Sequence, residues 1–144
     1  MECCFEWRKP SLSHHPYMCF SPHDPPCGPC GPCGPVINVT LRVENFLGGY
    51  NFSSSVNIVM NQQHLIVFLQ KAADMREEFR FSASYGTYGY YIDTINGVEA
   101  NYPKHETWWH IKNQDNVSLP LGSSCYIPSD GEIITYEFVK GAPH

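Results

Sequence analysis

The chain has few charges, no long apolar run and no basic cluster. Its 144 residues include 9 Lys and Arg and 14 Asp and Glu, so the net charge at pH 7 is −5. The longest basic run is Arg8-Lys9, which argues against a nucleic-acid partner. No apolar stretch approaches the roughly 18 residues that a membrane-spanning helix needs, so we expect no membrane span.

Sequence patterns typical of catalysis are also missing. The chain has no nucleophile-elbow serine, no phosphate-binding glycine loop and no HExxH helix. Cys125 and His110 are a conceivable nucleophile and base, but no acidic residue is placed to orient the histidine. Cys125 is better explained as a disulfide partner of an N-terminal cysteine or as a small buried side chain. We therefore predict that the protein is not an enzyme.

Residues 1–35 differ in composition from the rest of the chain. They hold eight of the twelve prolines and six of the seven cysteines, without apolar periodicity, and we predict an irregular leader. Cys27, Cys30 and Cys33 have the CxxC spacing of a metal site, but neither a fourth iron–sulfur cysteine nor a second pair of zinc ligands follows. The favoured interpretation is a leader with disulfide-bonded cysteines, followed by one domain over residues 36–144.

The first half of this domain shows two strands and a helix. Residues 36–43 alternate between apolar and polar, as in a half-buried strand, and residues 52–60 form a second strand. Asn61 is expected to cap a helix near Gln62 to Arg76. That helix has one apolar face, made by Leu65, Phe68, Leu69, Ala72 and Ala73.

The second half is predicted to contain four strands. The first covers residues 79–83, with Phe79 and Phe81 on one face. The second places Tyr90, Ile92 and Thr94 on one side and Tyr91, Asp93 and Ile95 on the other. Asn96-Gly97 is typical of a type I′ turn, and Ser129-Asp130-Gly131 also predicts a turn. The other two strands cover residues 107–111 and 133–139. The predicted fold class is α+β, a single domain with mainly antiparallel sheets and one substantial helix.

Aromatic residues concentrate in these strands, at Tyr85, Tyr88, Tyr90, Tyr91, Trp108 and Trp109. Strand aromatics usually pack in the core or form cross-strand pairs. In each adjacent pair, one member is expected to face the core and the other to face outward. Outward members grouped on neighbouring strands would form a flat wall suited to a large planar ligand.

The order of short motifs resembles the C-terminal β domain of the transcobalamin, intrinsic factor and haptocorrin family of cobalamin carriers. The matching residues are Tyr88-Gly89, Ile95-Asn96, Trp108-Trp109, Leu119 with Gly122, Tyr126-Ile127-Pro128 and Ile133 to Phe138. The resemblance extends more faintly back to Val36.

This resemblance implies a binding protein for cobalamin (vitamin B12), held as a ligand without catalysis. It implies that the corrin ring meets Tyr88, Gly89, Tyr90, Tyr91, Ile92, Trp108 and Trp109. The chain departs from the family pattern at Tyr88, where Trp is usual, and at Tyr90-Tyr91, where aliphatic residues are usual. No dedicated cobalt ligand is visible, and His110 is the one candidate.

The family binds cobalamin between this domain and a helical-barrel domain, and the segment before Val36 is too short for that barrel. One interpretation is a cobalamin-binding module that acts alone or with a helical-barrel partner or a receptor. The alternative is an extracellular interaction or adhesion domain of the same fold that does not bind cobalamin.

The resemblance also implies secretion of a disulfide-bonded glycoprotein that takes part in cobalamin, and hence cobalt, transport. Three sequons, at Asn38, Asn51 and Asn116, fit the N-glycosylation pattern. The N-terminus lacks the apolar core of a secretory signal, so we expect that the true start lies upstream or that the chain is a fragment.

Overall fold

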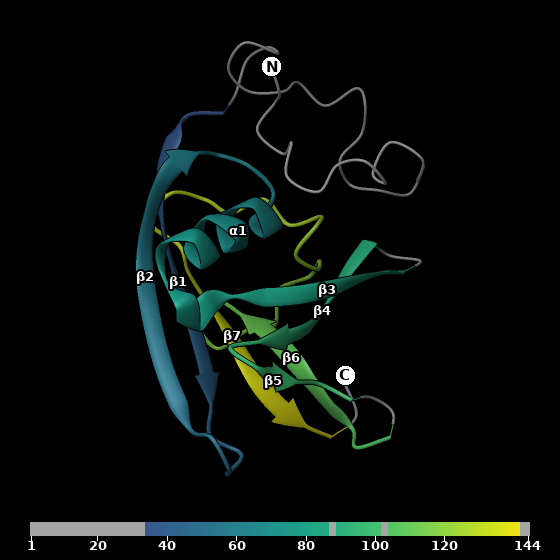
Figure 1. The fold of residues 1–144 in the computed structure, drawn as a ribbon. Helices are drawn as coiled ribbons and strands as arrows, with labels where there is room; N and C mark the ends of the chain where they lie inside the picture. Colours follow the sequence, from purple (N-terminus) through teal and green to yellow (C-terminus); the bar gives the residue numbers. More distant parts are fainter. Residues whose placement is uncertain (1–33, 87–88, 102–103, 142–144) are drawn as a thin grey trace.

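The computed structural model describes residues 34–86, 89–101 and 104–141, which form two β-sheets and one α-helix (Figure 1). The larger sheet has the strand order β2-β1-β7-β6 and the smaller one β3-β4-β5. The elements are β1 (Val36–Asn45), β2 (Phe52–Asn61), α1 (Leu65–Met75), the 3-10 turn η3 (Glu77–Phe79), β3 (Phe81–Gly86), β4 (Gly89–Ile95), β5 (Val98–Glu99), β6 (Thr107–Lys112) and β7 (Ile133–Lys140). The predicted α+β class with one helix is confirmed.

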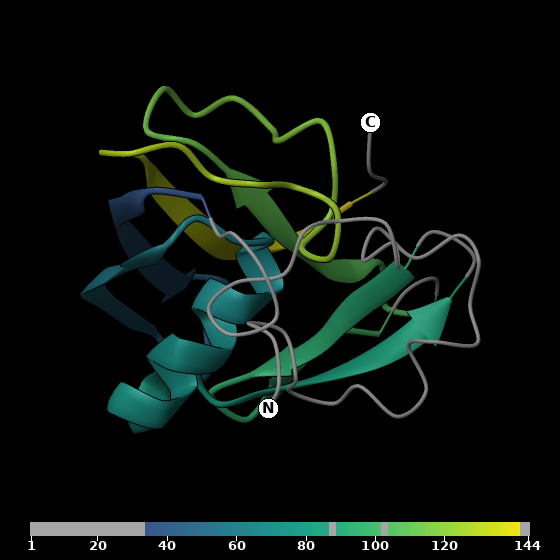
Figure 2. The same ribbon diagram turned by 90° about the horizontal axis from the view of Figure 1, so that it is seen from above.

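One face of the larger sheet forms the floor of the core. On β1 the buried residues are Ile37, Val39, Leu41 and Val43, which alternate with more exposed neighbours as predicted. β2 and β6 pair antiparallel with their neighbours, while β1 and β7 pair in parallel. Figure 2 shows α1 and the β3–β4 hairpin side by side on one side of this sheet. The core therefore lies between the sheet and these two elements.

The helix begins later than the sequence predicted. Asn61 belongs to β2 and its side chain donates to the carbonyl oxygen of Gly34, so the prediction that Asn61 caps the helix is wrong. The N-cap residue is His64, which makes no capping hydrogen bond from its side chain. The N–H groups of Leu65 and Ile66 instead donate to the carbonyl oxygens of Tyr126 and Ser123. A distant loop thus satisfies the donors that local caps usually satisfy.

The strand predicted over residues 79–83 begins two residues later. Phe79 is fully buried at the end of η3, where its own N–H donates to the carbonyl oxygen of Arg76. Phe81 is the first residue of β3. The two rings therefore do not share a strand face, because the chain makes a 3-10 turn before it extends.

The predicted faces of β4 are partly wrong, because the β3–β4 hairpin contains a β-bulge. The register shifts between Ser82 and Ala83, so that Asp93 has no partner in the ladder. The shift places Ile95 in the core and Thr94 with Asp93 toward solvent. The predicted alternation therefore holds only for Tyr90 to Asp93.

The smaller sheet ends in the predicted tight turn. Asn96 and Gly97 both have positive φ, 52° and 79°, as a type I′ turn requires. The turn brings Val98 opposite Ile95, so Val98–Glu99 forms a short additional strand. Within the described part of the chain, five strands follow the helix where four were predicted.

Candidate functional site

The β3–β4 hairpin carries an aromatic inner face. Tyr85 and Tyr90 are cross-strand partners whose ring centroids lie 5.4 Å apart, edge to face. Both are partly buried against the core, as are Phe81 and Ala83 on the same side. We call Phe81, Ala83, Tyr85 and Tyr90 the hairpin inner face. It holds three of the four aromatic rings among the described residues of the hairpin.

Two of the predicted site residues lie below this surface. Ile92 and Trp109 are 4% and 6% exposed, so neither side chain presents a contact area to a large ligand. Trp109 packs against Phe138 with ring centroids 4.9 Å apart, and its indole N–H donates to the carbonyl oxygen of Val98 at 3.1 Å. This bond joins β6 of the larger sheet to β5 of the smaller one. Trp109 therefore holds the hairpin in place.

Tyr91 lies on the opposite face of the hairpin. Its side chain is 46% exposed, and its neighbours on that face are polar. The hydroxyl of Ser84 donates to the carboxylate of Asp93 at 2.7 Å. Burial, with the nearby Asp93 charge, raises the pKa of Tyr91. Among the described residues of the hairpin, this outer face is hydrophilic and holds a single aromatic ring, that of Tyr91.

Trp108 points away from the core, on the outer face of the larger sheet. Its indole N–H donates to the carbonyl oxygen of Gly141 at 2.8 Å, and its ring meets His110 edge to face at 5.0 Å. The His110 ring also hydrogen-bonds to the Ser118 hydroxyl. Trp108 and Trp109 thus divide as predicted, one outward and one into the core. Trp108 and Tyr91, however, lie on different sheets and do not form one wall.

The Trp108–His110 contact is expected to give a pH-dependent fluorescence signal. Burial lowers the pKa of His110 from its usual 6.5, as does Lys112, while Glu137 acts in the opposite direction. As the pH falls, His110 is therefore protonated at a higher pH in the unfolded chain than in the folded protein. Its protonation reduces the stability of the folded protein as the pH falls below 6.5. We expect tryptophan fluorescence to change with a midpoint below pH 6.5, and His110→Gln to remove that step. If the fluorescence difference between the unchanged protein and His110→Gln has its midpoint at or above pH 6.5, the lowered pKa of His110 is contradicted.

The loop over residues 119–127 borders the hairpin inner face. The residue patterns alone had not predicted this position of the loop. The Tyr90 backbone N–H donates to the Ser124 hydroxyl at 3.0 Å. The loop is anchored below by Ser123, whose hydroxyl hydrogen-bonds to the buried Tyr136 hydroxyl at 2.7 Å. Leu119 and Tyr126 pack partly buried against the core. Only the resemblance, through its Leu-x-x-Gly and Tyr-Ile-Pro motifs, pointed to this loop.

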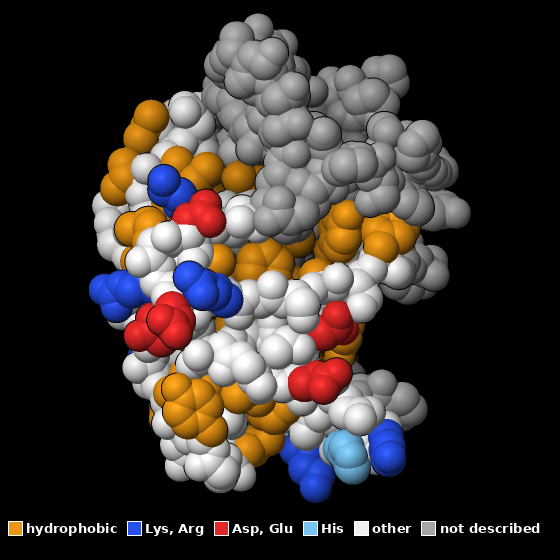
Figure 3. All heavy atoms as spheres, viewed as in Figure 1, with side chains coloured by type: hydrophobic (Ala, Val, Ile, Leu, Met, Phe, Trp, Pro, Cys, Tyr) orange, Lys and Arg blue, Asp and Glu red, His pale blue; other side chains and the backbone are white. Residues whose placement is uncertain are grey.

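Tyr126 also has a fixed hydroxyl. It donates to the Glu132 carboxylate at 2.5 Å. Burial, together with this hydrogen bond and the Glu132 charge, raises the pKa of Tyr126 to about 12. The phenol is therefore neutral at physiological pH and presents a ring rather than a charge. Figure 3 shows hydrophobic side chains gathered between α1 and the tip of the hairpin on this side of the molecule.

The remaining predicted features are placed as follows. Tyr88 and the cysteines of the leader lie outside the described residues, whereas Gly89 begins β4. Cys125 is disulfide-bonded. Asn38, Asn51 and Asn116 are all exposed. In the described ranges, no group of three or more potential metal ligands exists, and no helix is long and apolar enough to cross a membrane.

Comparison with known proteins gives a consistent result. No family model matches the chain. Over 107 residues it is 28% identical to cobalamin binding intrinsic factor of Rattus norvegicus and equally to that of Homo sapiens, covering 72% of this chain. The match spans 25% of each of those proteins, so the chain corresponds to about a quarter of their length.

Solved structures show the same fold. Haptocorrin in complex with Cbi matches with a TM-score of 0.64 at 24% identity, over 74% of this chain and 25% of haptocorrin. A candidate metal-binding protein from Ruminococcus gnavus matches with a TM-score of 0.60 at 17% identity, over 73% of this chain and 98% of that protein. The sequence match and the shared fold together confirm the resemblance of this chain to the C-terminal β domain of the transcobalamin family.

Proposed function

We propose that the protein is a non-catalytic corrinoid-binding module of an extracellular, carrier-like protein, with cobalamin as its ligand. The observation that carries the proposal is the joint match to intrinsic factor in sequence and to the haptocorrin–Cbi complex in fold. Secretion, N-glycosylation at Asn38, Asn51 and Asn116, and a part in vitamin B12 and cobalt transport belong to the same proposal. The exposure of all three asparagines supports glycosylation.

The hairpin inner face is the surface best suited to the corrin ring. Ligand sites combine apolar and aromatic walls with a few placed polar groups, and Tyr85 with Tyr90 provides such a wall. The 119–127 loop borders it. Gly89, at the start of β4, and Tyr88, which lies outside the described residues, belong to the proposed site because the resemblance implies them. Ile92 and Trp109 support the wall from below. Tyr91 and Trp108 face other directions, so their contribution to binding is expected to be small.

Binding by this module alone is expected to be weak. The ligand would be covered on one side only, and each loss of about 1.4 kcal/mol costs tenfold in affinity. We therefore expect a dissociation constant of roughly micromolar magnitude. Because the sequence shows no dedicated cobalt ligand, aquocobalamin and cyanocobalamin should bind alike. His110 is not an exception, since it lies on the outer face of the larger sheet beside Trp108.

A titration of the full chain tests the proposal. Cyanocobalamin and aquocobalamin are added while tryptophan fluorescence and corrin absorbance are followed, and circular dichroism verifies that the protein is folded. Saturable changes that agree between the two signals support corrinoid binding. Absence of binding at millimolar ligand to folded protein would refute it.

A second function is favoured by one observation. The Ruminococcus gnavus protein consists almost entirely of this fold, since the match covers 98% of its chain. The fold thus exists as a separate unit, which is compatible with an extracellular interaction or adhesion domain that binds no vitamin. A helical-barrel domain or a receptor is a partner to be sought under either proposal.

A further inference from the structure

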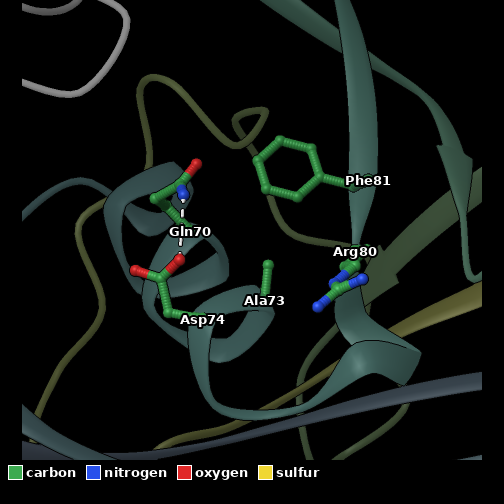
Figure 4. A pocket seen from close by; sticks show the side chains of 5 residues that line it. All are labelled: Gln70, Ala73, Asp74, Arg80 and Phe81. Atoms are coloured by element: carbon green, nitrogen blue, oxygen red, sulfur yellow. Dashed lines mark hydrogen bonds between the residues drawn. The ribbon is translucent and has the colours of Figure 1, made fainter.

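A hollow opens between α1 and the start of β3, at the end of the hairpin inner face away from the tip (Figure 4). It measures about 370 Å³ and is lined by Gln70, Ala73, Asp74, Arg80 and Phe81. Phe81 is shared with the hairpin inner face, four residues before Tyr85, or about 13 Å along an extended strand. A corrin with its peripheral side chains spans such a distance, whereas the hollow itself suits only a small group.

The lining of the hollow combines opposite hydrogen-bonding characters. Figure 4 shows the Phe81 ring and the Arg80 guanidinium extending toward the helix, with Ala73 facing them and Gln70 and Asp74 beyond it. Arg80 can only donate, while ionised Asp74 can only accept. Asp74 already accepts from the Gln70 amide at 3.4 Å, which orients its carboxylate. A group that both accepts and donates can therefore satisfy the two charged residues at once.

The end of the helix adds a charge preference. Ala73 and Asp74 belong to the last turn of α1, which contains no basic residue. The negative end of the helix dipole thus reinforces the Asp74 charge. N–H donors are favoured at this end of the hollow and carboxylates are disfavoured.

We infer that this hollow binds a primary carboxamide on the periphery of the corrinoid. The amide carbonyl accepts from Arg80, the amide N–H donates to Asp74, and the Phe81 ring packs against the adjoining carbon chain. This inference rests on the proposed corrinoid binding and adds the group that orients the ligand. It also states a chemical selectivity, because hydrolysis of that amide to a carboxylate places a negative charge beside Asp74.

The test uses the full chain and two variants of the hollow, Arg80→Met and Asp74→Asn. Arg76→Met and Glu77→Gln are matched controls, since both residues are exposed near the hollow without lining it. Each protein is titrated with cyanocobalamin and with its isolated monocarboxylic acid derivatives. We expect Arg80→Met to weaken cyanocobalamin binding about fivefold to tenfold, and the controls to change it less than twofold.

Selectivity provides the second readout. The unchanged protein should bind at least one monocarboxylic derivative about tenfold more weakly than cyanocobalamin, and Asp74→Asn should reduce that difference to below about threefold. If the unchanged protein binds cyanocobalamin but both variants behave like the controls, the inference about the hollow is wrong and the proposed function stands. If the folded, unchanged protein binds no corrinoid, both fail.

Discussion

Replacing Trp109 with Ala is expected to lower the free energy of unfolding by about 3–5 kcal/mol, enough to unfold a domain of ordinary stability. Trp109 is 6% exposed and packs against Phe138. Its indole N–H also closes the hydrogen bond to Val98 that joins the two sheets. Truncation therefore leaves a cavity and an unpaired carbonyl group at the junction on which the hairpin depends. Urea denaturation followed by circular dichroism measures the loss.

The neighbouring Trp108 supplies a matched control. It lies on the outer face of the same strand and hydrogen-bonds to the Gly141 carbonyl oxygen. Trp108→Ala should cost about 1 kcal/mol, the typical net value of one such bond, and leave the fold intact. If Trp109→Ala and Trp108→Ala lower the free energy of unfolding equally, both indoles are structural. The inward and outward faces of β6 would then contribute equally to stability.

Sequence periodicity correctly predicted the elements that bury one face and expose the other. On β1 the alternation of Ile37, Val39, Leu41 and Val43 is enforced because a slip by one residue would turn all four toward solvent. Asn96-Gly97 was equally predictable, since few other residue pairs tolerate two successive positive φ angles. In both cases, the information is local to a few residues.

Features that depend on distant partners were not predictable. The start of α1 is fixed by carbonyl groups of Ser123 and Tyr126, about sixty residues away in the sequence. The bulge opposite Ser82 and Ala83 leaves no mark in the apolar pattern of β4, yet it reverses the faces of Thr94 and Ile95. The relative positions of the candidate site residues also depend on distant pairing. Alternation correctly placed Tyr91 on the opposite side of the strand from Tyr90, but only the pairing of the strands shows that Trp108 and Tyr91 lie on different sheets.

This separation of faces leads to the largest expected effect on binding. Tyr90→Ala should weaken corrinoid binding by about 2 kcal/mol or more, or roughly thirtyfold, as for a central aromatic contact. The ring of Tyr90 forms half of the edge-to-face pair with Tyr85, so its removal also disorders the remaining ring. The adjacent Tyr91→Ala removes the same chemical group from the outer face and should change affinity less than about twofold.

The pair of tyrosine variants distinguishes the face that meets the ligand. Both are titrated with cyanocobalamin under identical conditions, and their melting temperatures are compared with that of the unchanged protein. Because Tyr90 is partly buried, Tyr90→Leu is included to retain apolar packing while removing the aromatic ring. A large loss with Tyr91→Ala and none with either Tyr90 variant would place the ligand on the outer face, and the hairpin inner face would lose its role. The expected result is a larger loss of affinity for Tyr90→Ala than for Tyr91→Ala. It would assign recognition of the planar ligand to the inner face of the hairpin, which α1 and the 119–127 loop also border.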